Sequence, residues 1–357
     1  MSERKHNFNA GPAALPLSVL QTVQHNLLDH EGLGLSILEM SHRTPPFEAI
    51  AAQAAATIGQ LLGMPDTHEV LFLQGGASLQ FAMVPMNLGE GGAYVDTGTW
   101  SSKAYAEART LGRAHQIWTD EKNGYRRVPG PDEALDVPGD APYLHYTTNN
   151  TIYGTQYHHL PRTDARLVAD LSSDFLSRPV DVARHALLYA GAQKNAGPAG
   201  VTVVIGHKDV TRGFAGRSDV PKILRYKTQA ENDSMYNTPN TFGIYVTGLV
   251  AEWVRKEGGL TAMAELAEQK AKLLYDLIDD HPLYRGHAES HSRSRMNVTF
   301  RMQDETQEKA LLKAAEARGI IGLKGHRSVG GLRASIYNAV PLQSVEALAA
   351  LMKDFKP

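Results

Sequence analysis

Short apolar runs alternate with helical patterns over the first two thirds of the chain. The runs suit buried strands and lie at residues 70–73, 93–95, 143–146, 167–169, 186–189 and 201–205. Helical spacing of apolar residues separates several of them, as at residues 78–87 and 101–111. Strands and helices that alternate in this way indicate crossover connections. We therefore predict an α/β fold with a mainly parallel sheet that helices cover on both faces.

The remaining patterns divide the chain into three parts. An N-terminal arm, residues 1–16, is interrupted by Gly11 and Pro12, and we expect it to lie across another surface. The large domain with the parallel sheet spans residues 17–258, and a smaller α+β domain spans residues 259–357. The helices and strands of the smaller domain are expected at residues 262–278, 296–302, 305–317, 332–337 and 340–355.

The amino-acid composition indicates a globular chain without a strong net charge. Its 357 residues correspond to about two domains of roughly 150 residues, and 42% of them are hydrophobic, which is enough for a large core. The net charge of −2 excludes a general attraction to nucleic acid or anionic lipid. No apolar run approaches the roughly 20 residues that span a bilayer, and the first residues hold no signal-peptide core. We expect a soluble protein that binds no nucleic acid and no membrane.

The chain contains no cysteine, which excludes disulfides, thiolate metal sites and thiol nucleophiles. The cytoplasm is the compartment expected for such a composition. The 15 histidines include no H-E-x-x-H pattern, and we expect no catalytic metal. Any anionic ligand has to be held by a local cluster of basic residues.

Lys194 lies in a turn of mostly small residues, 191–200, directly after a predicted strand. A lysine in such a place loses part of its hydration, which lowers its pKa and lets the free amine attack an aldehyde. An amine of this kind can form a Schiff base. A solvated loop lysine is the alternative that the sequence leaves open.

Asp170 closes the predicted strand at residues 167–169. Open α/β sheets bind ligands at the carboxyl ends of their strands. In pyridoxal phosphate enzymes an acid pairs with the protonated ring nitrogen and so keeps the ring an electron sink. Asp170 followed by Lys194 fits this arrangement, and a helix cap or turn acid is the alternative for Asp170 alone.

Three further turns follow predicted strands and supply groups that suit a flat cofactor with a phosphate. Residues 75–78, which include Ala77 and Ser78, precede a helix, and backbone N–H groups at a helix N-terminus cradle anions. Trp100 offers an aromatic face for stacking, and Thr151 offers a hydroxyl group to a ring oxygen. Ordinary turn or core residues are the alternative in each case.

Two basic clusters offer sites for substrate anions. His42 and Arg43 form one near the start of the chain, and His326 and Arg327 with Arg333 form the other near its end. Arginine binds carboxylates and phosphates through two parallel hydrogen bonds, and histidine adds a further donor. A substrate with both anions would use both clusters, whereas the alternative is a solvated basic face.

Motifs along nearly the whole chain resemble those of the phosphoserine aminotransferases, a family of class V aminotransferases with fold type I. These motifs are residues 7–13 (NFNAGPA), 39–43 (EMSHR), 74–81 (QGGASLQF), 169–174 (ADLSSD), 192–195 (AQKN), 236–239 (YNTP) and 326–335 (HRSVGGLRAS). The resemblance implies a pyridoxal phosphate transferase with a mainly parallel seven-stranded sheet in a large domain and a smaller C-terminal α+β domain.

The resemblance implies a role for each residue near the cofactor ring. Lys194 would bond pyridoxal 5'-phosphate as a Schiff base, and Asp170 would pair with the pyridine nitrogen. Trp100 would stack on the ring, and Thr151 would bond the ring hydroxyl group.

The resemblance also implies ligands for the cofactor phosphate. Ala77, Ser78 and Gln193 would hold it, joined by Asn237 and Thr238 from a second subunit, so that the active site needs a homodimer. Some members of the family have an arginine in the glycine-rich turn where this chain has Ser78. One anion contact is therefore absent here or is supplied from elsewhere.

The substrate ligands are implied in the same way. Arg333 would bind the substrate α-carboxylate. His42, Arg43, His326 and Arg327 would face the substrate phosphate or the side-chain carboxylate of glutamate.

The reaction that the resemblance implies is transamination from L-glutamate to 3-phosphohydroxypyruvate, which gives O-phospho-L-serine and 2-oxoglutarate in serine biosynthesis. Action on a phosphohydroxythreonine precursor of pyridoxine is a further implication. The nearest rival is an alanine– or serine–glyoxylate aminotransferase, which would need fewer bases for a phosphate. A regulatory protein that binds the cofactor without turnover is the rival from another class. A cysteine desulfurase is excluded because the chain has no thiol.

Overall fold

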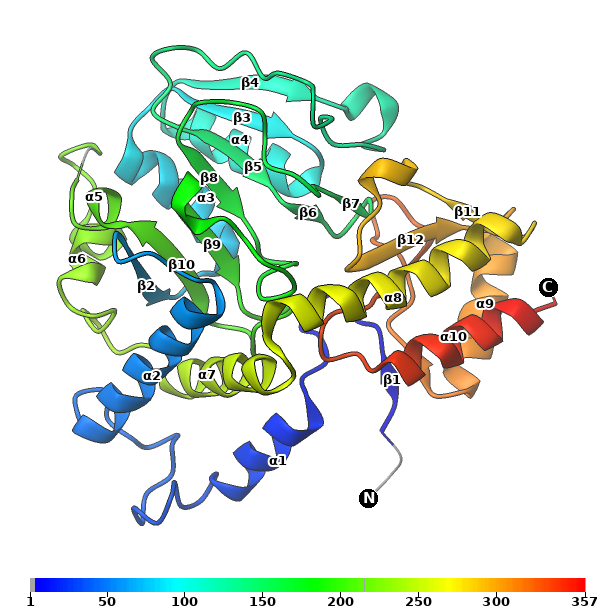
Figure 1. Cartoon of the computed structure of the whole chain (residues 1–357), viewed down its shortest axis with the longest axis horizontal. Coiled ribbons are helices and arrows are strands. Elements are labelled where there is room, and N and C mark those ends of the chain that lie inside the picture. Colours follow the sequence, from blue (N-terminus) through cyan, green and yellow to red (C-terminus); the bar gives the residue numbers. More distant parts are fainter. Residues whose placement is uncertain (1–3, 215, 357) are drawn as a thin grey trace.

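A seven-stranded sheet forms the centre of the larger part of the molecule (Figure 1). The computed structural model describes residues 4–214 and 216–356. The order of the strands is β2-β10-β9-β8-β5-β3-β4, and within this sheet β10 runs antiparallel to both of its neighbours. The strands are β2 (His68–Leu73), β3 (Gly92–Asp96), β4 (Ala114–Thr119), β5 (Leu144–Thr147), β8 (Leu167–Asp170), β9 (His185–Gly191) and β10 (Thr202–His207).

The six predicted strands are confirmed, and so is the mainly parallel α/β fold. Both faces of the sheet are buried, because neighbouring residues of one strand pack into different clusters. Val168 belongs to the cluster under α3 and α4, whereas Ala169 belongs to the cluster under α2 and α7. The helices of the larger part are α1 (Leu17–His25), α2 (Pro45–Leu61), α3 (Gly76–Leu88), α4 (Thr99–Leu111), α5 (Lys208–Thr211), α6 (Tyr226–Ala230) and α7 (Thr241–Lys256).

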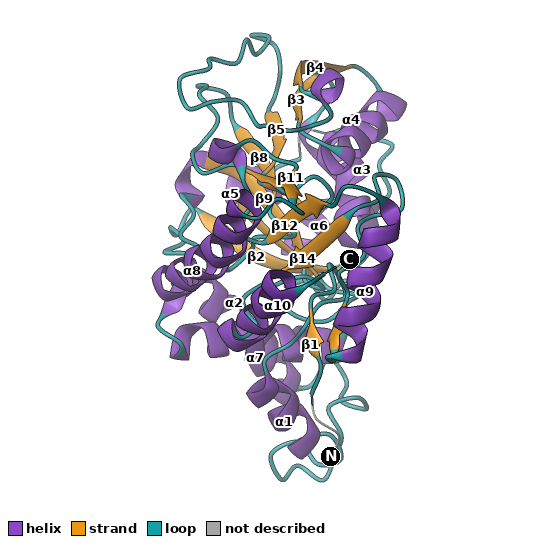
Figure 2. Ribbon diagram, turned by 90° about the vertical axis from the view of Figure 1, so that its right-hand side faces the viewer, coloured by secondary structure: helices purple, strands orange, loops and turns teal. Residues whose placement is uncertain are grey.

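The C-terminal part has a sheet and a core of its own. Its sheet has the order β11-β12-β14, and one face of these strands packs in a single core with α8, α9 and α10 (Figure 2). The elements are α8 (Gly259–Asp280), β11 (Arg285–Gly286), β12 (Asn297–Arg301), α9 (Glu305–Ala317), β14 (Leu332–Ser335) and α10 (Leu342–Asp354). Helix α8 joins the two cores, since Leu260 packs in the larger one and Leu274 in the smaller one. The exact domain boundary at residue 258 stays a prediction.

The N-terminal arm packs on the C-terminal part. Strand β1 (His6–Asn7) pairs in parallel with β13 (Ile320–Ile321), and Phe8 is completely buried in the smaller core. The arm then continues toward the large sheet, where it meets the turn after β9. The short strands β6 (Asn149–Asn150) and β7 (Thr155–Gln156) form a separate hairpin. In the part of the chain that the structure describes, no helix has the length and apolar character of a membrane span.

A buried lysine fixes the last turn before α10. Lys270, on α8, is 1% exposed, and its amine donates to the carbonyl oxygens of Tyr337 at 2.7 Å and Val340 at 3.0 Å. Burial lowers the pKa of Lys270 to about 7, because the charged form has lost its hydration. The neutral amine still has two N–H groups for these two bonds.

We expect Lys270 to make stability rise with pH. Between pH 7 and 10.5 the unfolded chain binds a proton at this residue that the folded chain has released, so the free energy of unfolding increases with pH. From pH 7 to pH 9 the increase amounts to about 2 kcal/mol. Urea unfolding of the apoprotein at both pH values measures it.

The Lys270→Met variant should lack this increment, whereas the exposed control Lys313→Met should retain it. Equal pH slopes in the wild type and Lys270→Met would show that the lysine stays charged in the fold.

Candidate active site

Lys194 lies in a tight turn between β9 and β10, at the edge of the sheet where β9 ends. The N–H of Ala192 donates to the carbonyl oxygen of Val201 at 2.9 Å, and the N–H of Gly197 donates to the carbonyl oxygen of Ala192 at 2.8 Å. Asn195 holds the turn to its surroundings, because its side chain donates to the carbonyl oxygen of Phe175 at 2.8 Å. These bonds fix the backbone on both sides of the lysine.

The N-terminal arm covers this turn. The N–H of Ala13 donates to the carbonyl oxygen of Gln193 at 2.9 Å. A Cβ atom on Gly11 would lie 3.2 Å from Cγ of Lys194, and φ of Gly11 is 145°, so a glycine suits this position. The arm predicted to cross another surface therefore crosses the stem of Lys194.

Asp170 ends β8 and is 4% exposed. Its Oδ1 accepts the backbone N–H of Ser172 at 2.8 Å, and the Ser172 hydroxyl accepts the N–H of Gly191 at 3.0 Å. Burial raises the pKa of Asp170, and the positive charge of Lys194 opposes this shift. A cation at the free carboxylate oxygen would stabilise the charged form.

The electrostatics of Lys194 favour a neutral amine. Burial lowers the pKa of Lys194 most, the Asp170 carboxylate raises it in part, and Arg333 lowers it further. An amine with a lowered pKa is a better nucleophile and a better proton acceptor at neutral pH.

Trp100 stands beside the lysine at the start of α4. The amine Nζ of Lys194 lies 5.3 Å from the centroid of the Trp100 ring. The indole Nε1 donates to the Thr151 hydroxyl at 3.0 Å, which leaves the hydroxyl proton of Thr151 free for another acceptor. The structure thus brings Lys194, Asp170, Trp100 and Thr151 together from the ends of four strands.

A buried carboxylate that our sequence analysis did not single out holds the turn before Trp100. Asp96 ends β3 and is 2% exposed. Its Oδ1 accepts the hydroxyl groups of Ser101 at 2.9 Å and Ser102 at 2.8 Å, and its Oδ2 accepts the Gln116 amide at 2.9 Å and the Tyr125 hydroxyl at 3.1 Å. These bonds fix the first turn of α4.

The glycine-rich turn leaves backbone N–H groups without acceptors at the start of α3. Gly75 caps α3 with φ of 88°, and the first N–H groups of the helix, including those of Ala77 and Ser78, have no acceptor one turn before them. An anion at this helix end would satisfy them. Together with the indole face and the free Thr151 hydroxyl, this turn fits the phosphate and the ring of the predicted cofactor.

Arg333, on β14, completes the group from the C-terminal part. Its Nη1 donates to the carbonyl oxygen of Thr151 at 3.0 Å, which points the guanidinium toward the lysine turn. Its Nε is buried and has no hydrogen-bond partner among the described residues. A bound carboxylate would satisfy this donor. Beside Arg333 lies a hollow of about 400 Å³, bordered by Tyr153 and His287.

His326 lies in the loop before β14, near Arg333. The backbone N–H of Ser328 donates to its Nδ1 at 3.3 Å, so Nε2 carries the proton of the neutral ring. Burial lowers the pKa of His326, and the positive charges of Arg333, Arg327 and Lys103 lower it further. His326 is therefore a neutral donor within a cationic group.

Four predicted residues are not joined to Lys194 or Arg333 by any hydrogen bond or hollow of the described residues. His42 and Arg43 border a hollow of about 460 Å³ together with residues 232–235. Asn237 and Thr238 are exposed a few residues later, where the Gln74 side chain donates to the carbonyl oxygen of Thr238 at 3.2 Å. Nε2 of His42 is buried and has no hydrogen-bond partner among the described residues. His42 and Arg43 therefore share a hollow with the segment that leads to Asn237 and Thr238.

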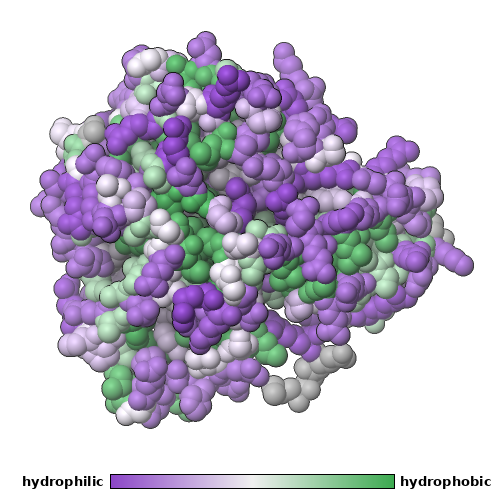
Figure 3. All heavy atoms as spheres, in the orientation of Figure 1, coloured by the Kyte–Doolittle hydropathy of each residue, from purple (hydrophilic) through white to green (hydrophobic). Residues whose placement is uncertain are grey.

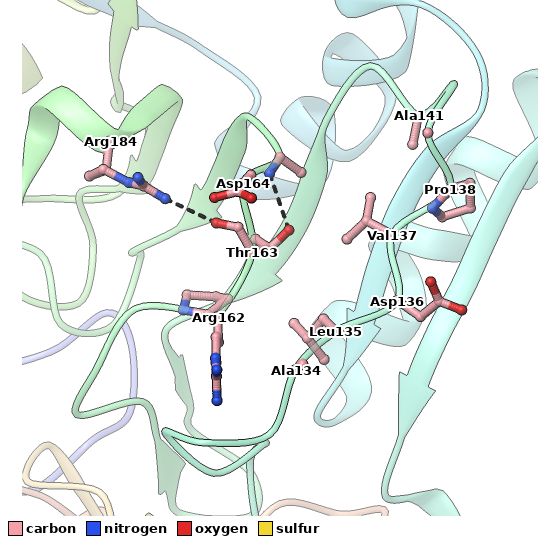
Figure 4. Close-up of a pocket in the computed structure, with 13 residues that line it drawn as sticks. Ala134, Leu135, Asp136, Val137, Pro138, Ala141, Arg162, Thr163, Asp164 and Arg184 are labelled. Carbon is pink, nitrogen blue, oxygen red and sulfur yellow. Dashed lines mark hydrogen bonds between the residues drawn. The ribbon is translucent and has the colours of Figure 1, made fainter.

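Another hollow, of about 700 Å³, opens where β5, β8 and β9 begin (Figure 4). Its arginines are directed at the backbone, since Arg184 donates to the carbonyl oxygen of Thr163 and Arg162 to that of Asp132, each at 3.0 Å. No predicted site residue borders this hollow. It lies at the opposite strand ends from the lysine group.

The comparison with protein families assigns the class. The family model "Aminotransferase class-V" matches residues 5–348, which is nearly the whole chain. The chain therefore belongs to the class-V aminotransferases.

Individual relatives narrow this assignment. The phosphoserine aminotransferases of Geobacillus kaustophilus and Pseudomonas aeruginosa are 50% and 51% identical, over 99% and 100% of this chain and 99% of each relative. The solved phosphoserine aminotransferase from Bacillus circulans subsp. alkalophilus is 49% identical over 99% of this chain and 98% of that chain, with a TM-score of 0.95. The resemblance seen in the sequence motifs is confirmed.

We expect Asp96→Asn to loosen Trp100. The amide cannot accept all the hydrogen bonds of the carboxylate, so the free energy of unfolding should fall by about 1.5–3 kcal/mol, the range for bonds to a charged group. The affinity of the apoprotein for pyridoxal phosphate should fall about tenfold, measured by absorbance titration.

The exposed residue Asp132 provides the matched control, Asp132→Asn. A normal cofactor affinity in Asp96→Asn, despite lower stability, would show that Asp96 serves the fold alone.

Proposed function

We propose that this chain transfers the amino group of L-glutamate to 3-phosphohydroxypyruvate, giving O-phospho-L-serine and 2-oxoglutarate in serine biosynthesis. The observation that carries the proposal is the cationic group of Arg333, His326 and Arg327 beside Lys194, in a chain half identical to phosphoserine aminotransferases over its full length. A substrate with an α-carboxylate and a second anion fits this group. The cytoplasm is the proposed site of this reaction.

Pyridoxal 5'-phosphate is the cofactor, and when bound it supplies an electron sink that allows a Cα–H bond of an amino acid to break. Lys194 would hold it through its amine, and the same amine would take up and return the proton at the substrate Cα. Asp170 would keep the ring nitrogen charged, and Trp100 would cover the ring. Ala77, Ser78 and Gln193 would hold the phosphate.

Arg333 would orient the substrate through its α-carboxylate. The bond from Nη1 to the Thr151 carbonyl leaves Nε and the rest of the guanidinium for the ligand. His326 and Arg327 would then face the phosphate or the side-chain carboxylate. His326 donates from Nε2 without carrying a charge of its own.

We propose that two copies of the chain form the working enzyme. His42, Arg43, Asn237 and Thr238 would reach the lysine group of the partner subunit. Six leucines of the segment around α1 stay exposed, and Figure 3 shows apolar surface in the lower part of the view, where α1 and α2 lie. Surface of this kind favours contact with another protein. The leucines are Leu17, Leu20, Leu28, Leu33, Leu35 and Leu38.

The first test compares amino donors in the half-reaction of the purified holoenzyme. Each charge-assisted hydrogen bond to a phosphate contributes about 1.5–3 kcal/mol before desolvation, so phosphoserine should be preferred over serine by at least about a hundredfold. Arg327→Ala should lower kcat/KM for phosphoserine more than for alanine. Arg333→Ala should lower kcat/KM for every amino acid alike.

Equal use of serine and phosphoserine by the wild type would favour a glyoxylate aminotransferase instead. Equal loss of phosphoserine and alanine in Arg327→Ala would reject the assignment of Arg327 to the second anion.

The second test concerns the shared site. Lys194→Ala and Arg43→Ala should each be nearly inactive, but subunits mixed in equal amounts by unfolding and refolding should regain about a quarter of the wild-type activity, because hybrid dimers contain one intact site. An inactive mixture that contains hybrid dimers would place Arg43 and Lys194 in the same subunit's site.

A further inference from the structure

Lys103 belongs to the face of α4 that carries Trp100. The two residues are three apart, so their side chains are neighbours on the helix surface. Nζ of Lys103 lies 4.9 Å from the centroid of the Trp100 ring, and Nζ of Lys194 lies 5.3 Å from the same centroid. The distance between the amines of Lys103 and Lys194 therefore cannot exceed the sum of these two distances. Lys103 stands at the margin of the lysine site.

The amine of Lys103 has no acceptor in this fold. Among the described residues it forms neither an ion pair nor a hydrogen bond, although Glu107 follows one turn later on the same helix and offers an ordinary surface pair. The side chain points toward the start of the helix instead, as long helical side chains do, and contacts the indole. Its charge remains available to a ligand.

The charge of Lys103 reaches His326 in the C-terminal part. The charges that lower the pKa of His326 are those of Arg333, Arg327 and Lys103, after the effect of burial. No described carboxylate forms an ion pair with Lys103, Arg327 or Arg333. Like charges gathered without a counter-ion repel one another, and an anion placed among them relieves this repulsion.

We propose that Lys103 binds the second anion of the substrate and so helps to select phosphorylated substrates. The proposal rests on the proposed function and adds a ligand to its site. Lys103 supplies a positive charge from α4, at the margin of the lysine site. A phosphate carries close to two negative charges at neutral pH, against one for a side-chain carboxylate. Lys103 therefore favours phosphoserine over glutamate, and glutamate over alanine.

The experiment compares half-reactions of the holoenzyme in Lys103→Met and the wild type. The preference for phosphoserine over alanine, as a ratio of kcat/KM values, should fall about tenfold, which corresponds to one charge-assisted contact. The change should lie in KM for phosphoserine. The preference for glutamate over alanine should fall less. Lys103→Arg should retain most of both preferences. Lys313→Met, an exposed lysine on α9, is the matched control.

Inorganic phosphate is the second probe, because it tests the anion contact without any phosphorylated amino acid. Its inhibition constant against the alanine half-reaction should rise about tenfold in Lys103→Met. If phosphoserine and alanine lose activity in proportion and the inhibition constant stays the same, Lys103 only supports Trp100 and the proposal is wrong.

A failure of the proposed substrate can be distinguished from a failure of the proposed role of Lys103. If the wild type prefers alanine to phosphoserine, the substrate assignment fails, but a weaker phosphate inhibition in Lys103→Met would still place an anion at Lys103. If the wild type prefers phosphoserine and Lys103→Met leaves that preference unchanged, only the role of Lys103 fails.

Discussion

The amine of the half-buried Lys194 and the carboxylate of the buried Asp170 act on each other's charge at the edge of the sheet. Burial disfavours the charged form of both groups, so it lowers the pKa of the lysine and raises that of the acid. Perturbed pKa values of this kind cluster at functional sites. The remaining features of the site hold this pair in place or bring charge to it.

Several polar bonds fix this edge of the sheet from different parts of the chain. Asn195 joins the lysine turn to the C-terminal part, because its Oδ1 accepts the N–H of Asn338 at 2.9 Å. Asp96 fixes the start of α4 and thereby Trp100. The N-terminal arm crosses the side chain of Lys194 at Gly11, and Arg333 donates a hydrogen bond to the carbonyl oxygen of Thr151. Substrate groups therefore meet an arrangement that is formed before they bind, which lowers the entropic cost of binding.

Most strands of the large sheet could be predicted from the sequence, because buried strands of a parallel sheet are continuous apolar runs. The residues that follow such a run lie at the ligand-binding edge of the sheet. Asp170 and Lys194 were found by this rule. Strand β4 was missed because it lies at the edge of the sheet and its sequence, AHQIWT, contains no apolar run. Asp96 also ends an apolar run, but position alone cannot separate a ligand acid from an acid that binds its own turn. In the proposed dimer, His42 and Asn237 would act at the partner subunit's site, and the position of a partner is not encoded locally in one chain.

Chemical trapping of the cofactor tests the central claim directly. The enzyme, loaded with pyridoxal phosphate, is reduced with borohydride, digested and mapped by mass spectrometry. We expect the phosphopyridoxyl group on the peptide that contains Lys194, and no label on Lys103 or Lys270. A label on either of these lysines, with Lys194 unlabelled, would show that another lysine carries the cofactor.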